Sequence, residues 1–162
     1  MIDPIPEGPH LAGGGERAES NTGAAGVARK RGVLVVDDDE DVRGVLAALL
    51  RRAGYAVWLA ADGREGVALY LSHGPDIDAV LLDVRMPSPD GPRTLAALRQ
   101  LNPRVRCCFM SGDLGTYSES ELRELGAAGM LYKPFSLAEV AALLGQLAND
   151  DQPVAAAAEG AG

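Results

Sequence analysis

Val33-Leu34-Val35-Val36-Asp37-Asp38 is the stretch of sequence that decides the fold. Its four apolar residues form a short unbroken run, which is typical of a strand covered on both faces. A second such run, Ala79-Val80-Leu81-Leu82, also ends in an acid, Asp83. Behind the first run, apolar residues recur at the spacing of a helix, at Val42, Val45, Leu46, Leu49 and Leu50.

The alternation of strand and helix repeats along the chain. We predict five strands, at residues 33–36, 55–59, 79–82, 105–110 and 129–132. A segment with helical periodicity follows each strand, and three of these segments begin with residue pairs that cap helices: Asp62 with Glu65, Ser118 with Glu121, and Ser136 with Glu139. Five such units predict an α/β protein whose parallel sheet is covered by helices on both sides.

Charge and apolar content exclude several classes of protein. The chain has 162 residues and a formal net charge of -8, which argues against binding nucleic acid or an anionic membrane through bulk electrostatics. No apolar run approaches the roughly 18 residues of a membrane span, and no secretory signal is visible. The neighbours Cys107 and Cys108 predict reduced thiols in the core, so we expect a cytoplasmic protein.

The composition changes at both ends of the chain. Residues 1–32 are rich in glycine and show no apolar periodicity, and residues 149–162 end in an Ala/Gly-rich stretch. Such segments bury too little surface to offset their ordering entropy, so we expect two disordered tails. Residues 33–148 are enough for one hydrophobic core, which predicts a single folded domain.

Residues with useful chemistry stand where four of the predicted strands end. Asp37 and Asp38 follow the first strand, Asp83 the third, Ser111 the fourth and Lys133 the fifth. In parallel α/β sheets these ends share one edge, where ligands bind. Three carboxylates at one edge repel each other, and a raised pKa or a bound cation relieves that repulsion.

The residue types at this edge match the needs of phosphoryl transfer to aspartate. Hard oxygen ligands suit Mg²⁺. A carboxylate beside such a metal can attack phosphorus and form an acyl phosphate. Ser111 could donate a hydrogen bond to one phosphoryl oxygen, and Lys133 could form an ion pair with another.

These motifs resemble the receiver domain of two-component response regulators, and the separations between them are also similar. The resemblance covers essentially all of residues 33–148. The motifs that carry it are Val35-Val36-Asp37-Asp38, Leu81-Leu82-Asp83-Val84-Arg85-Met86-Pro87 with Asp90-Gly91, Phe109-Met110-Ser111-Gly112, and Lys133-Pro134-Phe135.

The resemblance implies a role for each residue of the edge. Asp83 would be the phosphoacceptor, Ser111 the switch hydroxyl and Lys133 the phosphate-binding lysine. Mg²⁺ would be bound by the side chains of Asp37, Asp38 and Asp83 and by the main-chain carbonyl of Arg85. The Lys133-Pro134 bond is expected to be cis.

The resemblance also implies a fold and a function. The fold would be flavodoxin-like, a doubly wound five-stranded parallel sheet in the order 2-1-3-4-5 with five helices. The protein would be a single-domain response regulator, a phosphoacceptor rather than an enzyme of turnover. A sensor histidine kinase or a phosphotransfer protein would phosphorylate it, and a downstream protein would read its state. We expect no direct contact with nucleic acid or membrane, and a monomer or a weak phosphorylation-dependent dimer.

Two residues depart from the family pattern. Receivers often have an aromatic residue three positions before the lysine, where this chain has Met130. Tyr117 and Tyr132 are candidate substitutes, and a phosphorylation-independent docking module stays an alternative. Arg85, two residues after the acceptor, borders the phosphoryl group and can influence its lifetime.

A haloacid-dehalogenase-type phosphatase is the main enzymatic alternative. Such enzymes also use an aspartate after the first strand, a later Ser or Thr, and a lysine. Asp37-x-Asp39, Ser111 and Lys133 imitate that set. This interpretation leaves Asp83 without a role, and Asp39 is explained equally well as a helix cap.

Overall fold

The strand that opens the domain lies inside one parallel sheet. β1 (Gly32–Val36) pairs with β2 (Ala56–Ala60) on one side and with β3 (Ala79–Asp83) on the other. β4 (Cys107–Ser111) and β5 (Gly129–Tyr132) continue the sheet beyond β3. The order β2-β1-β3-β4-β5 confirms the predicted doubly wound, flavodoxin-like α/β fold.

The structure is a computed structural model, and it describes residues 28–149. The five expected helices are present in this range, and none of them combines the length and apolar content that crossing a membrane requires. They are α1 (Glu40–Arg52), α2 (Gly63–His73), α3 (Gly91–Leu101), α4 (Glu119–Glu124) and α5 (Leu137–Asn149), with a short 3-10 helix, η1 (Gly74–Asp76), after α2.

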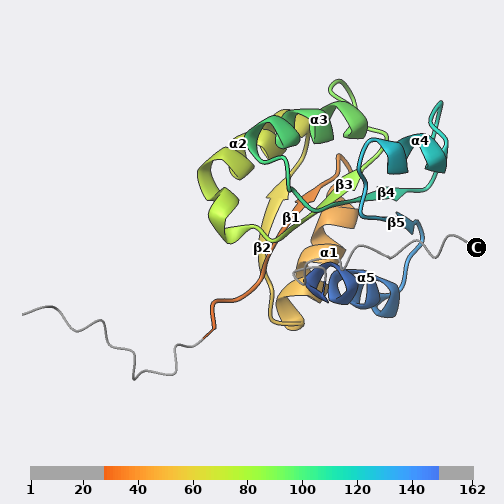
Figure 1. Cartoon of the computed structure of the whole chain (residues 1–162). Coiled ribbons are helices and arrows are strands. Elements are labelled where there is room, and N and C mark those ends of the chain that lie inside the picture. The colour runs from red at the N-terminus through yellow and green to blue at the C-terminus, as the bar shows by residue number, and fades with distance from the viewer. Residues whose placement is uncertain (1–27, 150–162) are drawn as a thin grey trace, which may run out of the picture.

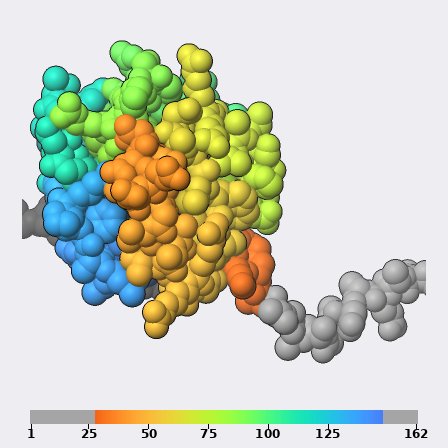
Figure 2. Space-filling model, turned by 180° about the vertical axis from the view of Figure 1, so that it is seen from behind, coloured from red at the N-terminus to blue at the C-terminus, as the bar shows by residue number. Residues whose placement is uncertain are grey.

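Helices cover both faces of the sheet (Figure 1). α2, α3 and α4 pack on one face, where Tyr70, Leu98 and Leu122 join the same apolar cluster. α1 and α5 pack on the other, and Figure 2 shows them side by side from behind, in orange and blue. The sheet therefore separates two apolar clusters, as its unbroken apolar strands predicted.

The two cysteines point to opposite faces of β4. Cys107 belongs to the cluster under α2, α3 and α4, and Cys108 to the cluster under α1 and α5. Both are free and buried, and burial raises the pKa of the Cys108 thiol to about 12. Their burial confirms their predicted place in the core, where thiols stay protonated.

Capping residues set the starts of the helices where the sequence predicted them. Ser118 accepts a hydrogen bond from the backbone N–H of Glu121 at 3.1 Å, and the Glu121 carboxylate accepts one from the N–H of Ser118 at 2.7 Å. Ser136 and Glu139 make the same reciprocal pair before α5. Asp62 caps α2. These bonds satisfy backbone donors that a helix start leaves free.

The fourth strand is shorter than predicted. β4 begins at Cys107, whereas the apolar pattern placed its start at residue 105. Val105 is buried, but its backbone N–H donates to the carbonyl of Asn102 at 3.0 Å and closes a turn. Because a turn can also bury an apolar side chain, the apolar run overstated the strand. β2 likewise lies one residue later than predicted.

The predicted disordered tails lie almost entirely outside the described residues. Residues 28–32 of the first tail and Asn149 of the second are described. Residues 28–31 lead into β1, but Gly32 is the first residue of β1 and Asn149 the last of α5, so the expectation of disorder was wrong at these two positions. Arg29 in this lead forms an ion pair with Asp78 at 2.7 Å. Domain boundaries at residues 33 and 148 stay a prediction.

The two-layer core predicts where a truncation is costly. Leu82 is fully buried in β3, so Leu82→Ala should lower the free energy of unfolding by about 2–5 kcal/mol through lost burial and a cavity. Leu71 on α2 is 70% exposed, so the matched Leu71→Ala should change it by less than about 0.5 kcal/mol. Urea denaturation measures both, and equal losses would contradict the assigned core.

Candidate functional site

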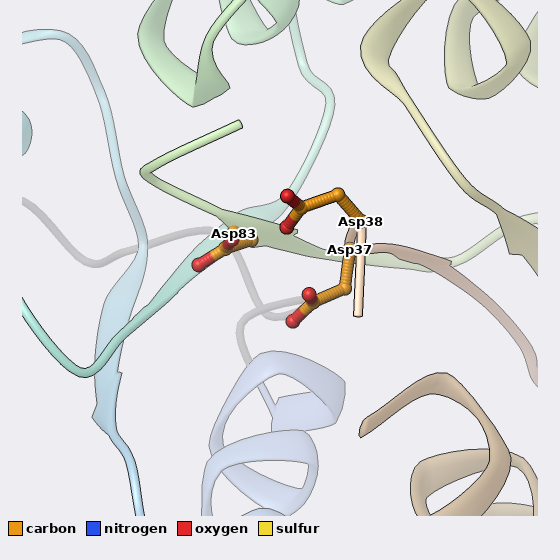
Figure 3. Close-up of side chains that lie close together, drawn as sticks. All are labelled: Asp37, Asp38 and Asp83. Atoms are coloured by element: carbon orange, nitrogen blue, oxygen red, sulfur yellow. The ribbon is translucent and has the colours of Figure 1, made fainter. Parts of the chain in front are cut away.

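Three carboxylates meet at the carboxyl edge of the sheet (Figure 3). Asp37 and Asp38 follow β1, and Asp83 ends β3, its neighbour in the sheet. One oxygen of each carboxylate lies within 4.8 Å of the others. Asp37 and Asp83 are buried while Asp38 is exposed, so the cluster has a buried floor and one open side.

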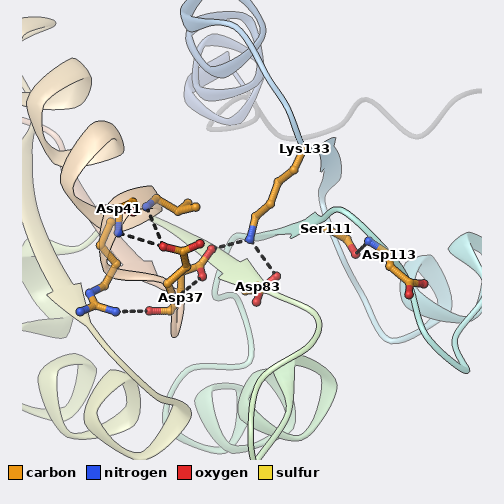
Figure 4. Close-up of polar contacts among 9 residues, drawn as sticks. Asp37, Asp41, Asp83, Ser111, Asp113 and Lys133 are labelled. Carbon is orange, nitrogen blue, oxygen red and sulfur yellow. Dashed lines mark hydrogen bonds and ion pairs between the residues drawn. The ribbon is translucent and has the colours of Figure 1, made fainter.

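Lys133 joins this cluster from the end of β5 (Figure 4). Its Nζ donates to Asp37 Oδ2 at 2.7 Å and to Asp83 Oδ1 at 3.3 Å. Burial disfavours its charge, but the hydrogen bonds and the negative charges of these two carboxylates outweigh burial and raise the pKa of Lys133. The lysine is therefore an ammonium that offsets part of the local negative charge.

Asp83 lies in surroundings that disfavour its negative charge. Burial, followed by the negative charge of Asp37, raises the pKa of Asp83 to about 6, although Lys133 opposes the shift. One ammonium does not neutralise three carboxylates, so the cluster favours a further cation or proton.

The donor set fits a hard divalent cation. Three carboxylates from two adjacent strands provide oxygen ligands, and the exposed side of Asp38 leaves room for water, which Mg²⁺ usually keeps. The elevated pKa of Asp83 has the sign expected where a positive charge belongs. Asp37, Asp38 and Asp83 would hold the ion, and the main-chain carbonyl of Arg85 stays a predicted fourth ligand.

Ser111 ends β4 at the same edge. It is buried, and its Oγ accepts a hydrogen bond from the backbone N–H of Asp113 at 3.0 Å. The Asp113 carboxylate in turn pairs with Arg85 at 2.6 Å. The loops that follow β3 and β4 are thus joined beside Asp83 by an exposed ion pair.

Two backbone features shape the rim of the site. Gly91 starts α3 so close to β3 that an added Cβ would lie 2.3 Å from the carbonyl oxygen of Asp83, which explains a glycine there. The Lys133-Pro134 bond is cis, as expected, and the Ser88-Pro89 bond is also cis, which no motif predicted.

Two polar residues at the site were missed from sequence. Arg43 on α1 donates from Nη1 to the carbonyl of Asp37 at 2.7 Å, and no motif marks it. Asp113 was signalled only by its place two residues after Ser111 in a glycine-flanked loop. Both act through loop or helix geometry that residue spacing alone does not specify.

Comparison with known proteins places this geometry in a family. The model of the response regulator receiver domain matches residues 33–145. The chain belongs to the receiver domain family. The recognition of this family from sequence is therefore confirmed, together with its fold.

Individual relatives show how receivers are used in other proteins. The transcriptional regulatory protein PrrA of Mycobacterium tuberculosis is 40% identical over 110 residues, which are 68% of this chain and 46% of PrrA. The chain thus spans about half the length of this relative. Sporulation initiation phosphotransferase F of Bacillus subtilis is 32% identical over 110 residues, 67% of this chain and 86% of that protein.

A solved structure provides a comparison in a metal-bound form. The response regulator TrrA of Thermotoga maritima, in complex with Mg²⁺-BeF, superposes with a TM-score of 0.64 at 25% identity. The superposition covers 72% of this chain and 98% of TrrA.

The receiver lacks an aromatic side chain at the position of Met130. Met130 is half-buried and packs against the cluster under α4. Tyr132 is 49% exposed, and its hydroxyl donates to Glu119. Tyr117 packs against the same cluster as Met130, and its hydroxyl donates to Asp90 at 2.8 Å. Neither tyrosine occupies the missing position.

Asp39 does not join the carboxylate cluster, which argues against the phosphatase alternative. Its side chain accepts hydrogen bonds from the backbone N–H groups of Asp41 and Val42 and caps α1. A dehalogenase-type enzyme needs that acid at the reacting edge, whereas this receiver places Asp83 there.

Cation binding should be measurable as added stability. Mg²⁺ should raise the thermal unfolding midpoint, because an ion that binds only the folded state adds about 2.7 kcal/mol at a hundredfold excess over its Kd. Asp38→Asn should weaken the response. Asp41→Asn, a charge-matched change on α1 outside the cluster, should respond like the wild type, and an equal response in both variants would contradict the site.

Asp83 should make the fold less stable as pH rises. Its pKa is about 6 in the folded protein and 3.8 ordinarily, so the folded state holds more protons between these values and loses stability as pH rises through them. In Mg²⁺-free buffer, Asp83→Asn should raise the free energy of unfolding by about 1–3 kcal/mol near pH 7. Near pH 4 the gain should vanish, and a pH-independent gain in urea denaturation would contradict this account.

Proposed function

We propose that this receiver accepts a phosphoryl group on Asp83 from a phosphohistidine of a sensor histidine kinase or a phosphotransfer protein. The observation that carries the proposal is the meeting of three carboxylates and one ammonium at the ends of β1, β3 and β5. Among them Asp83 combines burial, a raised pKa and contact with Lys133, which suits a carboxylate that must react at one defined place.

In the proposed reaction, a carboxylate oxygen of Asp83 attacks phosphorus. The new P–O bond forms as the P–N bond to the donor imidazole breaks. The leaving nitrogen keeps the electron pair of that bond, and the donor leaves as a neutral imidazole whose other ring nitrogen already carries the proton. Mg²⁺, when bound by Asp37 and Asp38, would neutralise charge on the phosphoryl oxygens. The product is an acyl phosphate on Asp83, so the receiver is a phosphoacceptor rather than an enzyme that releases product.

Lys133 and Ser111 would bind the phosphoryl oxygens and so respond to their negative charge. In the structure the Lys133 ammonium is hydrogen-bonded to Asp37 and Asp83. In the phosphorylated state it would form an ion pair with a phosphoryl oxygen, and the Ser111 hydroxyl would donate a hydrogen bond to another. Ser111 now accepts the N–H of Asp113, so moving this hydroxyl would disturb the loop after β4. That shift would be passed to α4, β5 and α5.

The proposed output is binding of a downstream protein to the surface of α4, β5 and α5. Three large apolar side chains stand exposed there, Leu125, Tyr132 and Leu137. The Tyr132–Glu119 hydrogen bond links β5 to α4 on that surface. We propose no direct contact of this domain with nucleic acid or membrane, and a monomer or weak phosphorylation-dependent dimer.

We further propose that the domain acts in the cytoplasm as a single-domain response regulator. Reduced, buried cysteines fit that compartment. Sporulation initiation phosphotransferase F supports this proposal because the similarity covers most of its length, whereas PrrA is about twice as long as its matched region. A phosphorylation-independent docking module is the second candidate, because Met130 stands where receivers often have an aromatic residue.

The acceptor can be identified by intact mass. With Mg²⁺ and a small acyl phosphate donor, the full chain should gain the mass of one phosphoryl group. Asp83→Asn should abolish the adduct, and Lys133→Ala should slow its formation at least tenfold, about 1.4 kcal/mol. Asp41→Asn, an exposed acid of the same edge, is the control and should react normally.

Each other outcome favours a different function. An adduct that persists in Asp83→Asn would contradict the acceptor. Repeated hydrolysis of a phosphoester without a trapped adduct would favour a phosphatase. A chain that acquires no adduct with any donor would favour the docking module.

A further inference from the structure

The peptide between Asp37 and Asp38 joins two of the three acids of the carboxylate cluster. β1 ends at Val36, so both acids lie just beyond the strand. The backbone N–H of Asp37 still donates to the carbonyl of Ala60 at 3.1 Å, beside the last pair of the β1–β2 ladder. The carbonyl of Asp37, which begins the peptide to Asp38, accepts a hydrogen bond from a side chain of α1.

The donor is Arg43, in the first turn of α1. Its backbone N–H donates to the carbonyl of Asp39, the N-cap residue of the helix, at 3.1 Å. Its half-buried side chain turns back along the chain and donates from Nη1 to the carbonyl of Asp37 at 2.7 Å. A guanidinium is a permanent cation and therefore a strong donor. Arg43 thus ties the start of the helix to the end of the strand.

Hydrogen bonds between close neighbours shape the rest of this turn. Asp37 Oδ1 accepts one from the N–H of Asp39 at 2.9 Å, and Asp39 Oδ1 accepts one from the N–H of Asp41 at 2.9 Å. Each of these spans two residues and fixes the turn locally. The Arg43 bond spans six residues and so places the Asp37–Asp38 peptide relative to the helix.

Asp38 depends on that peptide more than the other two acids do. Asp37 and Asp83 are buried, and the Lys133 ammonium donates to them at 2.7 and 3.3 Å. Asp38 is exposed, and its carboxylate accepts no hydrogen bond from residues 28–149. The position of this carboxylate is therefore set by its own torsions and by the peptide that precedes it.

We propose that Arg43 is a positioning residue of the cation site, which holds Asp38 where its carboxylate can bind Mg²⁺ by fixing the carbonyl of Asp37. This inference rests on the proposed cation site, and it assigns Arg43 no contact with the ion. Loss of a group that orients a metal ligand typically lowers metal affinity by roughly 10- to 100-fold.

Charge and positioning predict opposite effects of losing this arginine. A guanidinium near the cluster repels a divalent cation, so the loss of its charge alone would tighten Mg²⁺ binding. The loss of its hydrogen bond frees the peptide before Asp38 and weakens Mg²⁺ binding, although a positive charge has been removed. The sign of the change in affinity therefore separates the two effects.

The test is calorimetric titration of Mg²⁺ into the full chain, with the amide signal of Asp39 followed by NMR as a reporter of the turn. Arg43→Met keeps the apolar stem but removes the donor, and it should weaken Mg²⁺ binding about tenfold, which corresponds to about 1.4 kcal/mol. Arg43→Lys restores a charged donor and should recover the affinity to within about threefold. Arg51→Met, the same change in the last turn of α1, should leave the affinity unchanged.

The titration uses no phosphoryl donor, so this inference and the proposed phosphotransfer can fail separately. With Mg²⁺ at saturation, Arg43→Met should acquire the phosphoryl adduct at the wild-type rate, because the hydrogen bond acts only through binding of the ion. A slower adduct under that condition would overturn a purely positioning role. A wild type that binds Mg²⁺ without acquiring an adduct would contradict the phosphotransfer alone.

Equal or tighter Mg²⁺ binding by Arg43→Met would overturn the positioning role. Equal weakening in Arg51→Met would also overturn it, since the effect would then belong to α1 as a whole. Failure of Arg43→Lys to recover the affinity would show that a donor at this position is not what matters. A wild type that binds no Mg²⁺ would overturn the positioning role together with the cation site. Circular dichroism of all three variants should match the wild type, because none of them removes a fully buried side chain.

Discussion

Repulsion among three carboxylates is the constraint around which this domain is arranged. Asp37, Asp38 and Asp83 are brought together because β1 and β3 are neighbours in a parallel sheet and both end at the same edge. Lys133 crosses from β5 to offset part of that charge, and it is the only lysine in residues 33–148. The negative charge that Lys133 does not offset favours the binding of a cation, alone or together with a phosphoryl group.

The fold was predictable because its signals are local and repeated. Unbroken apolar runs, capping pairs and the acids after β1 and β3 each follow from residues close in sequence, and together they specify a parallel sheet with acids at its carboxyl edge. The start of β4 was not predictable from the same signals, since Val105 is buried from a turn. The site acids were predictable because a strand end fixes where its next residue points.

The contacts between loops were beyond the reach of the sequence. The Arg85–Asp113 pair and the Arg43 bond to the carbonyl of Asp37 depend on where flexible side chains end after the backbone is set. The packing of Met130 could not be predicted from the sequence either. Its half-buried place against the cluster under α4 explains how a methionine fills the space, but the sequence offered no way to know which side chain would take up the contacts of the aromatic residue.

The opposite orientations of Cys107 and Cys108 have a consequence for how such a domain can vary. Adjacent residues of β4 belong to different apolar layers, and the same strand places Ser111 at the carboxyl edge of the sheet, four residues after Cys107. Loss or gain of one residue within β4 would exchange the layers that every side chain enters and would also displace the serine from Asp83. Length changes are therefore expected in the loops between elements. The strands that carry site residues are expected to keep their length, because that length sets the distance between the core and the edge of the sheet.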